Sequence, residues 1–321
     1  MCTAISYQGK SSHYFGRNLD LSYSYQEQVV ITPRNFPFSF RNGTQLQHHF
    51  AMIGMATVSD GYPLYYEATN EHGLSMAGLN FPGIATFLPK SSGKSNITPF
   101  ELIPWILGQC ISLAQAKQML QSCNVWKLPF SRELPLSPLH WMIASSEGSL
   151  TVEPMPDGLK IYDNPIGVLT NNPPFRYHLY HLSDYRNLTP TETNMPFGTV
   201  PIEPYSSAMG AIGLPGDFSS ASRFIRAAFV KEHSESGNHD VSQFFHILSS
   251  VAIPRGCVIA EKQGEHITVY SSCCDTAAGI YYYTTYDNCR ITAIRMKESQ
   301  LENDRLQVFH LRKNTDIYWE N

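Results

Sequence analysis

The chain has 321 residues, of which 23 are basic and 27 acidic, giving a formal net charge of −4. No basic stripe and no apolar run near the ~20 residues of a membrane span occurs, which argues against a nucleic-acid-binding or membrane-spanning protein. The seven cysteines lack the spacing of a disulfide framework, and no secretory signal is evident at the N-terminus. We therefore expect a cytoplasmic protein with free thiols, and a single domain over residues 1–321 because no linker-like stretch divides it.

The first half of the chain predicts strands on either side of two helices. Strands are expected over residues 2–7, 12–23, 48–58, 63–69 and 73–81, and again over 139–145, 149–155, 159–164 and 166–173. The segment 98–101 (TPFE) is a capping-box pattern that predicts a helix start, and Pro104 should kink that helix or shift its first residue. Ser112 predicts the start of a second helix, with Gln115 three residues later.

The second half repeats this order. Residues 182–218 are rich in Pro, Thr, Asn and Gly, and long irregular stretches of this kind are usually functional or lie at interfaces. Helices are expected from about Ser220 and Asp240, and strands over 266–272, 279–287, 289–296 and 306–311. Blocks of strands alternating with blocks of helices indicate an α+β layered architecture.

Cys2 directly follows the initiator methionine. A small residue at this position permits removal of Met1, and Cys2 would then carry a thiol and a free α-amino group on one residue. Such a residue can act as a nucleophile that uses its own amine as the base. The alternative is that Cys2 stands there by chance.

The neighbouring sequence brings a cation to this thiol. The segment 8–11 (QGKS) predicts a hairpin turn, and a turn centred between Gly9 and Lys10 places Cys2 opposite Arg17, or next to it if the loop is one residue longer. A nearby guanidinium favours the thiolate. Asp20 lies three positions beyond Arg17, on the opposite face of a straight strand, so we expect a bend at Asn18–Leu19 if both are to serve Cys2.

Three further polar positions are candidates for such a site. Asn80 and the pair Asn171–Asn172 end predicted strands just before prolines, where an amide is a stationary donor or, alternatively, ordinary turn chemistry. Arg223 falls in the first turn of a predicted helix, where a cation opposes the macrodipole. This position indicates a role beyond local stability, or a surface salt bridge.

Six segments carry a resemblance: MCTAISY, YFGRNLD, NEHGLSMAGLNFPG, GVLTNNPPF, GLPGDFSSASRFIR and GIYYYTTYDN. Together and in this order, from Cys2 to about residue 300, they closely resemble the choloylglycine hydrolase family, which includes bile salt hydrolases and penicillin V acylases. The resemblance implies an N-terminal nucleophile (Ntn) hydrolase fold, an αββα four-layer sandwich. It also implies amide hydrolysis through a thioester acyl-enzyme, with no cofactor and no metal.

The resemblance assigns roles residue by residue. Cys2 matches the nucleophile, Asp20 the carboxylate that holds the α-amino group, and Arg17 the cation beside the thiol. Asn171 matches the side-chain donor to the oxyanion, and Asn80 the residue whose backbone N–H completes the oxyanion hole. Arg223 matches the arginine that braces this set.

The resemblance also indicates the substrate. The segment GLNFPG is similar to bile salt hydrolases, whereas penicillin V acylases typically carry Tyr in place of Asn80, which favours glycine- or taurine-conjugated bile salts. A steroid needs an apolar wall, for which the candidates are Leu19, Tyr23, Leu134, Leu136 and Leu139. Leu19 and Tyr23 could equally be core residues of a strand, and the segment 134–139 a proline-rich surface loop. The chain departs from many relatives at 176–178, where Arg-Tyr-His replaces a more usual Asp-Tyr-Gln.

Two alternatives remain open at this level. One is a penicillin V or N-acyl-homoserine lactone acylase, and the other is a non-catalytic steroid-binding protein on the same scaffold. By analogy with relatives, a homotetramer is expected, with residues 182–218 as an assembly loop.

Overall fold

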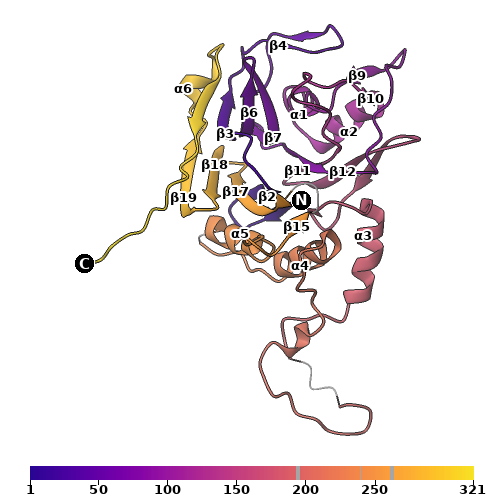
Figure 1. Cartoon of the computed structure of the whole chain (residues 1–321), viewed down its shortest axis with the longest axis vertical. Coiled ribbons are helices and arrows are strands. Elements are labelled where there is room, and N and C mark those ends of the chain that lie inside the picture. Colours follow the sequence, from indigo (N-terminus) through magenta and orange to yellow (C-terminus); the bar gives the residue numbers. More distant parts are fainter. Residues whose placement is uncertain (193–195, 239, 261–263) are drawn as a thin grey trace.

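The computed structural model describes residues 1–192, 196–238, 240–260 and 264–321, and it contains two large antiparallel sheets (Figure 1). The six-stranded sheet has the order β14 (Val168–Leu169), β1 (Cys2–Gln8), β2 (His13–Leu21), β17 (Ile267–Asp275), β18 (Ile280–Thr285) and β19 (Asn288–Arg295). The eight-stranded sheet has the order β13 (Gly158–Asp163), β12 (Gly148–Met155), β11 (Leu139–Ser145), β8 (Ser75–Asn80), β7 (Tyr62–Asn70), β6 (Met52–Ser59), β3 (Gln28–Thr32) and β20 (Gln307–His310).

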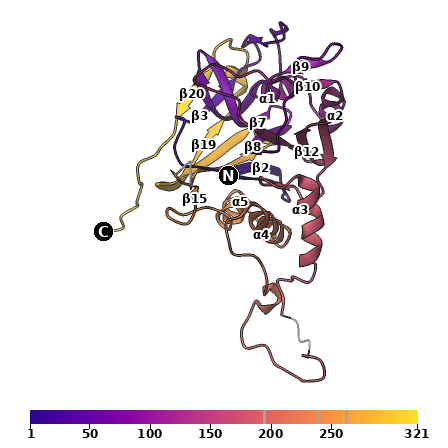
Figure 2. The ribbon, with the colours of Figure 1, turned by 45° about the vertical axis from the view of Figure 1, so that its right-hand side comes forward.

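Helices cover the outer face of each sheet. Helices α4 (Ser220–Glu232) and α5 (Asp240–Ser249) lie against the six-stranded sheet, and α1 (Leu102–Leu107) and α2 (Leu113–Gln121) lie against the eight-stranded one (Figure 2). Two apolar clusters match these layers: one joins α4 and α5 to the first sheet and to the space between the sheets, and the other joins α1 and α2 to the second sheet. This is the expected αββα sandwich of the Ntn hydrolases.

The register of the first hairpin differs from the prediction. Cys2 pairs with Leu19, and Arg17 pairs with Ala4. The predicted pairing of Cys2 with Arg17 was wrong because the turn is longer, closed by a hydrogen bond from Gly9 N to Ser12 O (2.9 Å). Arg17 is nevertheless a diagonal neighbour of Cys2 on the same face of the sheet, a separation that a long side chain spans.

The predicted bend at Asn18–Leu19 was also wrong, since β2 continues without a break from His13 to Leu21. Arg17 reaches the facing sheet through Gly78 O in β8, while Asn18, on the opposite face, donates to Leu248 O in α5. Asp20 therefore faces the helices and Arg17 faces the second sheet. Both lie near Cys2 without a bend, because Cys2 sits at the very end of β1 and is approached from both faces.

Most predicted helices are confirmed, with one shift and one omission. Helix α2 begins after Ser112, whose side chain accepts from Gln115 N, and α4 begins at Ser220. Helix α1 begins only at Leu102, which leaves Pro104 in the first turn, where the missing N–H costs no helical hydrogen bond. Helix α3 (Phe175–Leu182) was not predicted from the sequence.

After α3 ends at Leu182, the only helices in the described parts of the segment 182–218 are the short 3₁₀ helices η1 (Ser183–Tyr185) and η2 (Met209–Ala211). The segment extends from α3 away from the sheets (Figure 1). Several of its apolar side chains are exposed, among them Phe197, Ile202 and Tyr205. None of the helices in the described ranges is long and apolar enough to cross a membrane.

Candidate active site

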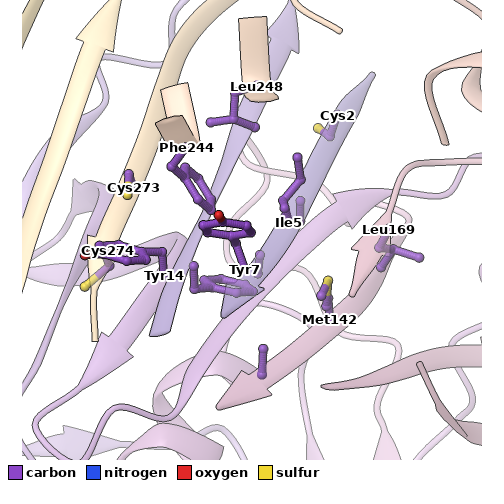
Figure 3. Close-up of a cluster of buried hydrophobic side chains, with 14 of the residues drawn as sticks. Cys2, Ile5, Tyr7, Tyr14, Met142, Leu169, Phe244, Leu248, Cys273 and Cys274 are labelled. Atoms are coloured by element: carbon purple, nitrogen blue, oxygen red, sulfur yellow. The ribbon is translucent and has the colours of Figure 1, made fainter. Parts of the chain in front are cut away.

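Cys2 begins β1 and is only 2% exposed, at the edge of the buried cluster between the layers (Figure 3). Met1 extends the β1–β2 ladder by one residue: its amino group donates to Asp20 O (2.6 Å), and Asp20 N donates to Met1 O (3.0 Å). The backbone N–H of Cys2 points the other way and donates to Asn171 Oδ1 (2.8 Å). With Met1 in place, the nitrogen of Cys2 is thus held by Asn171.

Arg17 is fully buried at the point where β7 and β8 separate. Pairing between these strands ends at Glu67–Ala77, and the next carbonyls on each strand both accept from Arg17 Nη1: Gly78 O at 2.6 Å and Tyr66 O at 3.2 Å. The guanidinium thus takes the place of a backbone hydrogen-bonded pair between β7 and β8. Its Nε and Nη2 have no hydrogen-bond partner in the described part of the chain.

Burial by itself would lower the pKa of Arg17, but the negative forms of Cys2, Tyr270, Glu67 and Asp20 raise it overall. The guanidinium therefore stays charged. A fixed cation thus lies on the same face of the sheet as the Cys2 side chain.

Glu67 is a buried carboxylate that the sequence analysis did not identify. It lies 3.8 Å from Arg17 Nε and accepts hydrogen bonds from the Tyr270 hydroxyl (2.8 Å), Ser272 Oγ (2.9 Å) and the Tyr281 hydroxyl (2.5 Å). Burial raises its pKa, an effect that Arg17 and the three hydroxyls oppose. Glu67 is the nearest counter-charge to Arg17 on the side away from Cys2. Nothing in its local sequence separates it from other polar residues of a strand.

Arg223 connects the groups around Cys2 from the helix side. Its guanidinium donates to Phe218 O (3.0 Å), Cys2 O (2.5 Å), Thr3 Oγ1 (2.7 Å) and Asn171 Oδ1 (2.8 Å). It also lies 3.8 Å from Asp20 Oδ2. Arg223 is fully buried, so the surface salt bridge considered from the sequence is excluded.

Asp20 lies close to this set without touching the nitrogen of Cys2. Its Oδ1 accepts from Thr268 Oγ1 (2.7 Å), and its Oδ2 is buried without a hydrogen-bond partner among the described residues. A buried, unpartnered carboxylate oxygen is costly. Asp20 Oδ2 is therefore available to accept a hydrogen bond from a cationic group at the start of the chain.

Asn80 and Asn171 meet at the same end of the sheets. Asn171 Nδ2 donates one proton to Asn80 O (2.6 Å), which leaves its second proton available. Phe81 N donates to the carbonyl oxygen of Pro138, the residue before β11 (2.6 Å), so in the alternating pattern of an antiparallel ladder the N–H of Asn80 points away from β11. These two donors are candidates to bind one oxygen atom beside Cys2.

His178, in the segment where the chain departs from many relatives, lies directly behind Asn171. Its Nε2 donates to Asn171 O (3.0 Å), and Asn171 N donates to Ser220 Oγ (2.8 Å). Burial lowers the pKa of His178 to about 4, so the imidazole is neutral near pH 7. From the sequence, residues 176–178 could change either the rim of the site or only a surface. The structure shows that this segment supports Asn171.

Comparison with known proteins identifies the family of this chain. The family model described as linear amide C–N hydrolases, choloylglycine hydrolase family, matches residues 2–309. This chain belongs to the choloylglycine hydrolase family. It is 49% identical, over 100% of both chains, to a bile salt hydrolase/transferase of Lactiplantibacillus plantarum. It is 33% identical, over 96% of this chain and 100% of the other, to a conjugated bile acid hydrolase of Lactobacillus acidophilus.

Solved structures show the same relationship. The C2A mutant of conjugated bile acid hydrolase from Clostridium perfringens superposes with a TM-score of 0.93 at 35% identity over 100% of both chains. Penicillin V acylase from Agrobacterium tumefaciens has a TM-score of 0.76 at 18% identity, covering 98% of this chain and 93% of the other, and shows the fold alone.

The predicted substrate-binding residues differ in burial and in their position relative to Cys2 and Asn80. Leu19 lies opposite Cys2 and is buried, and Leu139 lies opposite Asn80 and is partly buried. Tyr23 is 57% exposed just beyond β2, its hydroxyl 2.6 Å from that of Tyr25. Leu134 and Leu136 are half-buried in the loop before β11. Within the described ranges, no group of three or more His, Cys, Asp or Glu side chains is arranged to hold a metal ion.

Proposed function

We propose that this enzyme hydrolyses the amide bond of glycine- or taurine-conjugated bile salts through a thioester on Cys2. The observation that carries the proposal is the convergence on Cys2 of Arg17, Arg223 and Asn171 from three separate parts of the chain. The substrate class rests on the full-length relatives named for bile salts or conjugated bile acids, and on Asn80 in the segment GLNFPG.

Maturation comes first. Loss of Met1 would leave the α-amino group on Cys2 and would free the backbone N–H and carbonyl of Asp20, which Met1 now occupies. The unpartnered Oδ2 of Asp20 is the acceptor we assign to that amine, with Asn171 Oδ1 as the second. An α-amino group has an ordinary pKa of about 7.7–8.0, so near neutral pH it can accept the thiol proton and return it.

The chemistry then needs two steps. The Cys2 thiolate, stabilised by Arg17, attacks the scissile carbonyl carbon, and the resulting oxyanion accepts from Asn171 Nδ2 and the N–H of Asn80. The C–N bond breaks as the α-ammonium gives its proton to the leaving glycine or taurine nitrogen. Water, deprotonated by the same amine, then attacks the thioester, releasing the bile acid and restoring the thiol. Arg223 fixes Cys2 O and Asn171 Oδ1 throughout.

The apolar wall for the steroid is proposed to include Leu19, Tyr23, Leu134, Leu136 and Leu139. Leu19 and Leu139 are the best supported, since one lies opposite Cys2 and the other opposite Asn80. Acyl transfer to an amine in place of water is open to the same thioester, and relatives carry the name hydrolase/transferase.

We further propose a single-domain enzyme of the cytoplasm that assembles as a homotetramer. The exposed Phe197, Ile202 and Tyr205 of the segment 182–218 support an assembly role for that segment. Size-exclusion chromatography with light scattering measures the assembly, and a monomer would contradict it.

The function is tested by competition. Protein whose intact mass shows that Met1 is absent is given glycocholate, taurocholate and penicillin V together, and the released amines are quantified by mass spectrometry. We expect glycine or taurine to dominate and to disappear in Cys2→Ala. Cys110→Ala, which removes another buried thiol in the α1–α2 layer, should retain the activity.

Other outcomes identify the alternatives. Dominant release of 6-aminopenicillanic acid would assign the protein to the penicillin V acylases despite Asn80. Absence of turnover by protein that lacks Met1 would leave the non-catalytic steroid-binding protein.

A further inference from the structure

The two segments that form the candidate oxyanion hole are joined to each other by their side chains. Asn171 Nδ2 donates to Asn80 O (2.6 Å), and Asn172 Nδ2 donates to Pro82 O (2.7 Å). Their relative position is therefore fixed at the surface of the site. The two segments belong to different sheets, since Asn80 ends β8 and Asn171 follows β14. Their relative position therefore also depends on contacts in the interior, between the sheets.

His140, in β11, contacts both segments with one ring. Its Nε2 lies 2.9 Å from the carbonyl oxygen of Thr170, the residue before Asn171. Its ring is stacked on Phe81, the residue after Asn80, with centroids 4.2 Å apart and an interplanar angle of 6°. His140 is 0% exposed. A single imidazole thus bridges the two sheets directly beneath both proposed oxyanion donors.

The hydrogen bonds define where the protons on this ring must be. A carbonyl oxygen only accepts, so Nε2 carries a proton. Nδ1 lies 3.3 Å from Glu153 Oε1, which already accepts from Phe175 N (2.8 Å). An imidazole nitrogen and a carboxylate oxygen form a hydrogen bond only with a proton between them, so this contact pairs His140 with Glu153. Both side chains are fully buried, where each serves as the partner of the other.

The surrounding groups do not supply another partner for this proton. Neutral His178 donates its own Nε2 proton to Asn171 O, Tyr162 approaches Glu153 from β13, and Arg223 is engaged with Cys2 and Asn171. Glu153 Oε2 has no hydrogen-bond partner in the described ranges. His140 and Glu153 consequently depend on each other.

We infer that His140, held by Glu153, is a positioning residue of the oxyanion hole: it fixes the Thr170 carbonyl and the Phe81 ring so that Asn171 Nδ2 and the N–H of Asn80 converge on one oxygen. His140 is fully buried and its ring nitrogens contact Thr170 O and Glu153, not Cys2, so its effect on the reaction is through the two donors. This inference rests on the proposed function, because it assigns a purpose to the donors of that reaction.

The test compares His140→Gln with the wild type in the presence of glycocholate. We expect kcat per competent active site to fall about tenfold or more, since losing one oxyanion donor outright costs roughly 10²–10³, while KM changes less than about threefold. Competent sites are counted by iodoacetamide alkylation of the N-terminal peptide, quantified by mass spectrometry. The pH profile of that alkylation should equal that of the wild type, because alkylation needs the thiolate and not the oxyanion hole.

The matched control is His49→Gln. His49 is also a buried imidazole bonded to backbone carbonyls, those of Phe50 and Phe36 (2.8 and 2.9 Å), but it packs on Phe38 away from Cys2. The His49→Gln variant should be less stable than the wild type, but its kcat per competent active site should be unchanged. A purely structural role of His140 would give the same result as this control, and that result would overturn the inference.

Two further variants keep the test decisive if His140→Gln does not fold. Glu153→Gln preserves shape and can still accept from Phe175 N, but it has neither the charge nor the proton of the carboxyl group that pairs with His140 Nδ1, so we expect a similar fall in kcat. Phe81→Leu removes the stacked ring at similar apolar volume and should lower kcat by a smaller factor. Wild-type kcat in either variant would contradict the inference. Absence of turnover by the wild type itself would instead contradict the proposed function.

Discussion

Arg223 should be the most costly side chain of the site to remove. It is 0% exposed and makes four hydrogen bonds, to Phe218 O, Cys2 O, Thr3 Oγ1 and Asn171 Oδ1, besides the approach to Asp20. In the chain that retains Met1, Arg223→Ala leaves the buried carboxylate of Asp20 without the guanidinium that lies 3.8 Å from its Oδ2. Removing one member of a buried charge pair costs about 3–5 kcal/mol. Since ordinary domains are stable by about 5–15 kcal/mol, this variant should be close to unfolding.

The assay is urea unfolding of the wild type, Arg223→Ala and a control on the same helix, Arg226→Ala. Arg226 donates to three carbonyls, Ser250 O (2.6 Å), Pro215 O (2.7 Å) and Asp217 O (3.1 Å), but it is only half-buried, so water can replace it. We expect a loss of about 1–2 kcal/mol for the control. Arg223→Lys should recover part of the loss, since an ammonium cannot reproduce the planar fork. Equal losses for Arg223→Ala and Arg226→Ala would refute the reasoning.

Three further predictions concern stability. Gly16→Ala should lower the free energy of unfolding by at least about 2 kcal/mol, because a Cβ there would lie 1.9 Å from the backbone oxygen of Ser272; a thermal midpoint equal to the wild type would contradict this. Burial lowers the pKa of His13 to about 4, so between pH 6.5 and 4 the unfolded chain binds a proton that the folded one does not. Its contribution to stability, about 3 kcal/mol, is present above pH 6.5 and is lost as pH falls toward 4; His13→Gln should flatten that part of the stability–pH curve in urea titrations. Ser219→Ala removes the N-cap that accepts from Ser222 N and should cost about 1 kcal/mol, measured by the same titration, with no change expected if α4 is held by packing alone.

The sequence by itself determined the chemistry that this protein carries and the approximate place of its elements. The hairpin turn after Gln8 brings Arg17 to the same face as Cys2, and this holds although the predicted register was wrong. The turn residues alone bring the two strands, and with them Cys2 and Arg17, close together. The number of residues in the loop decides which residues of the two strands pair. The side chains of Ser112 and Ser219 cap backbone N–H groups only three residues away, so the start of each following helix can be predicted from the local sequence.

Only the tertiary structure decided which distant residues meet at Cys2. Asn171 and Arg223 are far from Cys2 in sequence, and their hydrogen bonds to it exist because β14 pairs with β1 and α4 packs on the same sheet. Their roles came from the family resemblance, since no local pattern reports a contact between sheet and helix.

Glu67 and His140 were missed for the same reason. Each is a polar residue inside a strand, where the alternation of apolar and polar positions predicts exposure. Both are instead buried because a second sheet covers their face and supplies partners: Tyr270 and Tyr281 for Glu67, and Thr170 O for His140. Whether a polar strand residue faces water or a partner depends on the layer packed against it, and that layer comes from elsewhere in the chain.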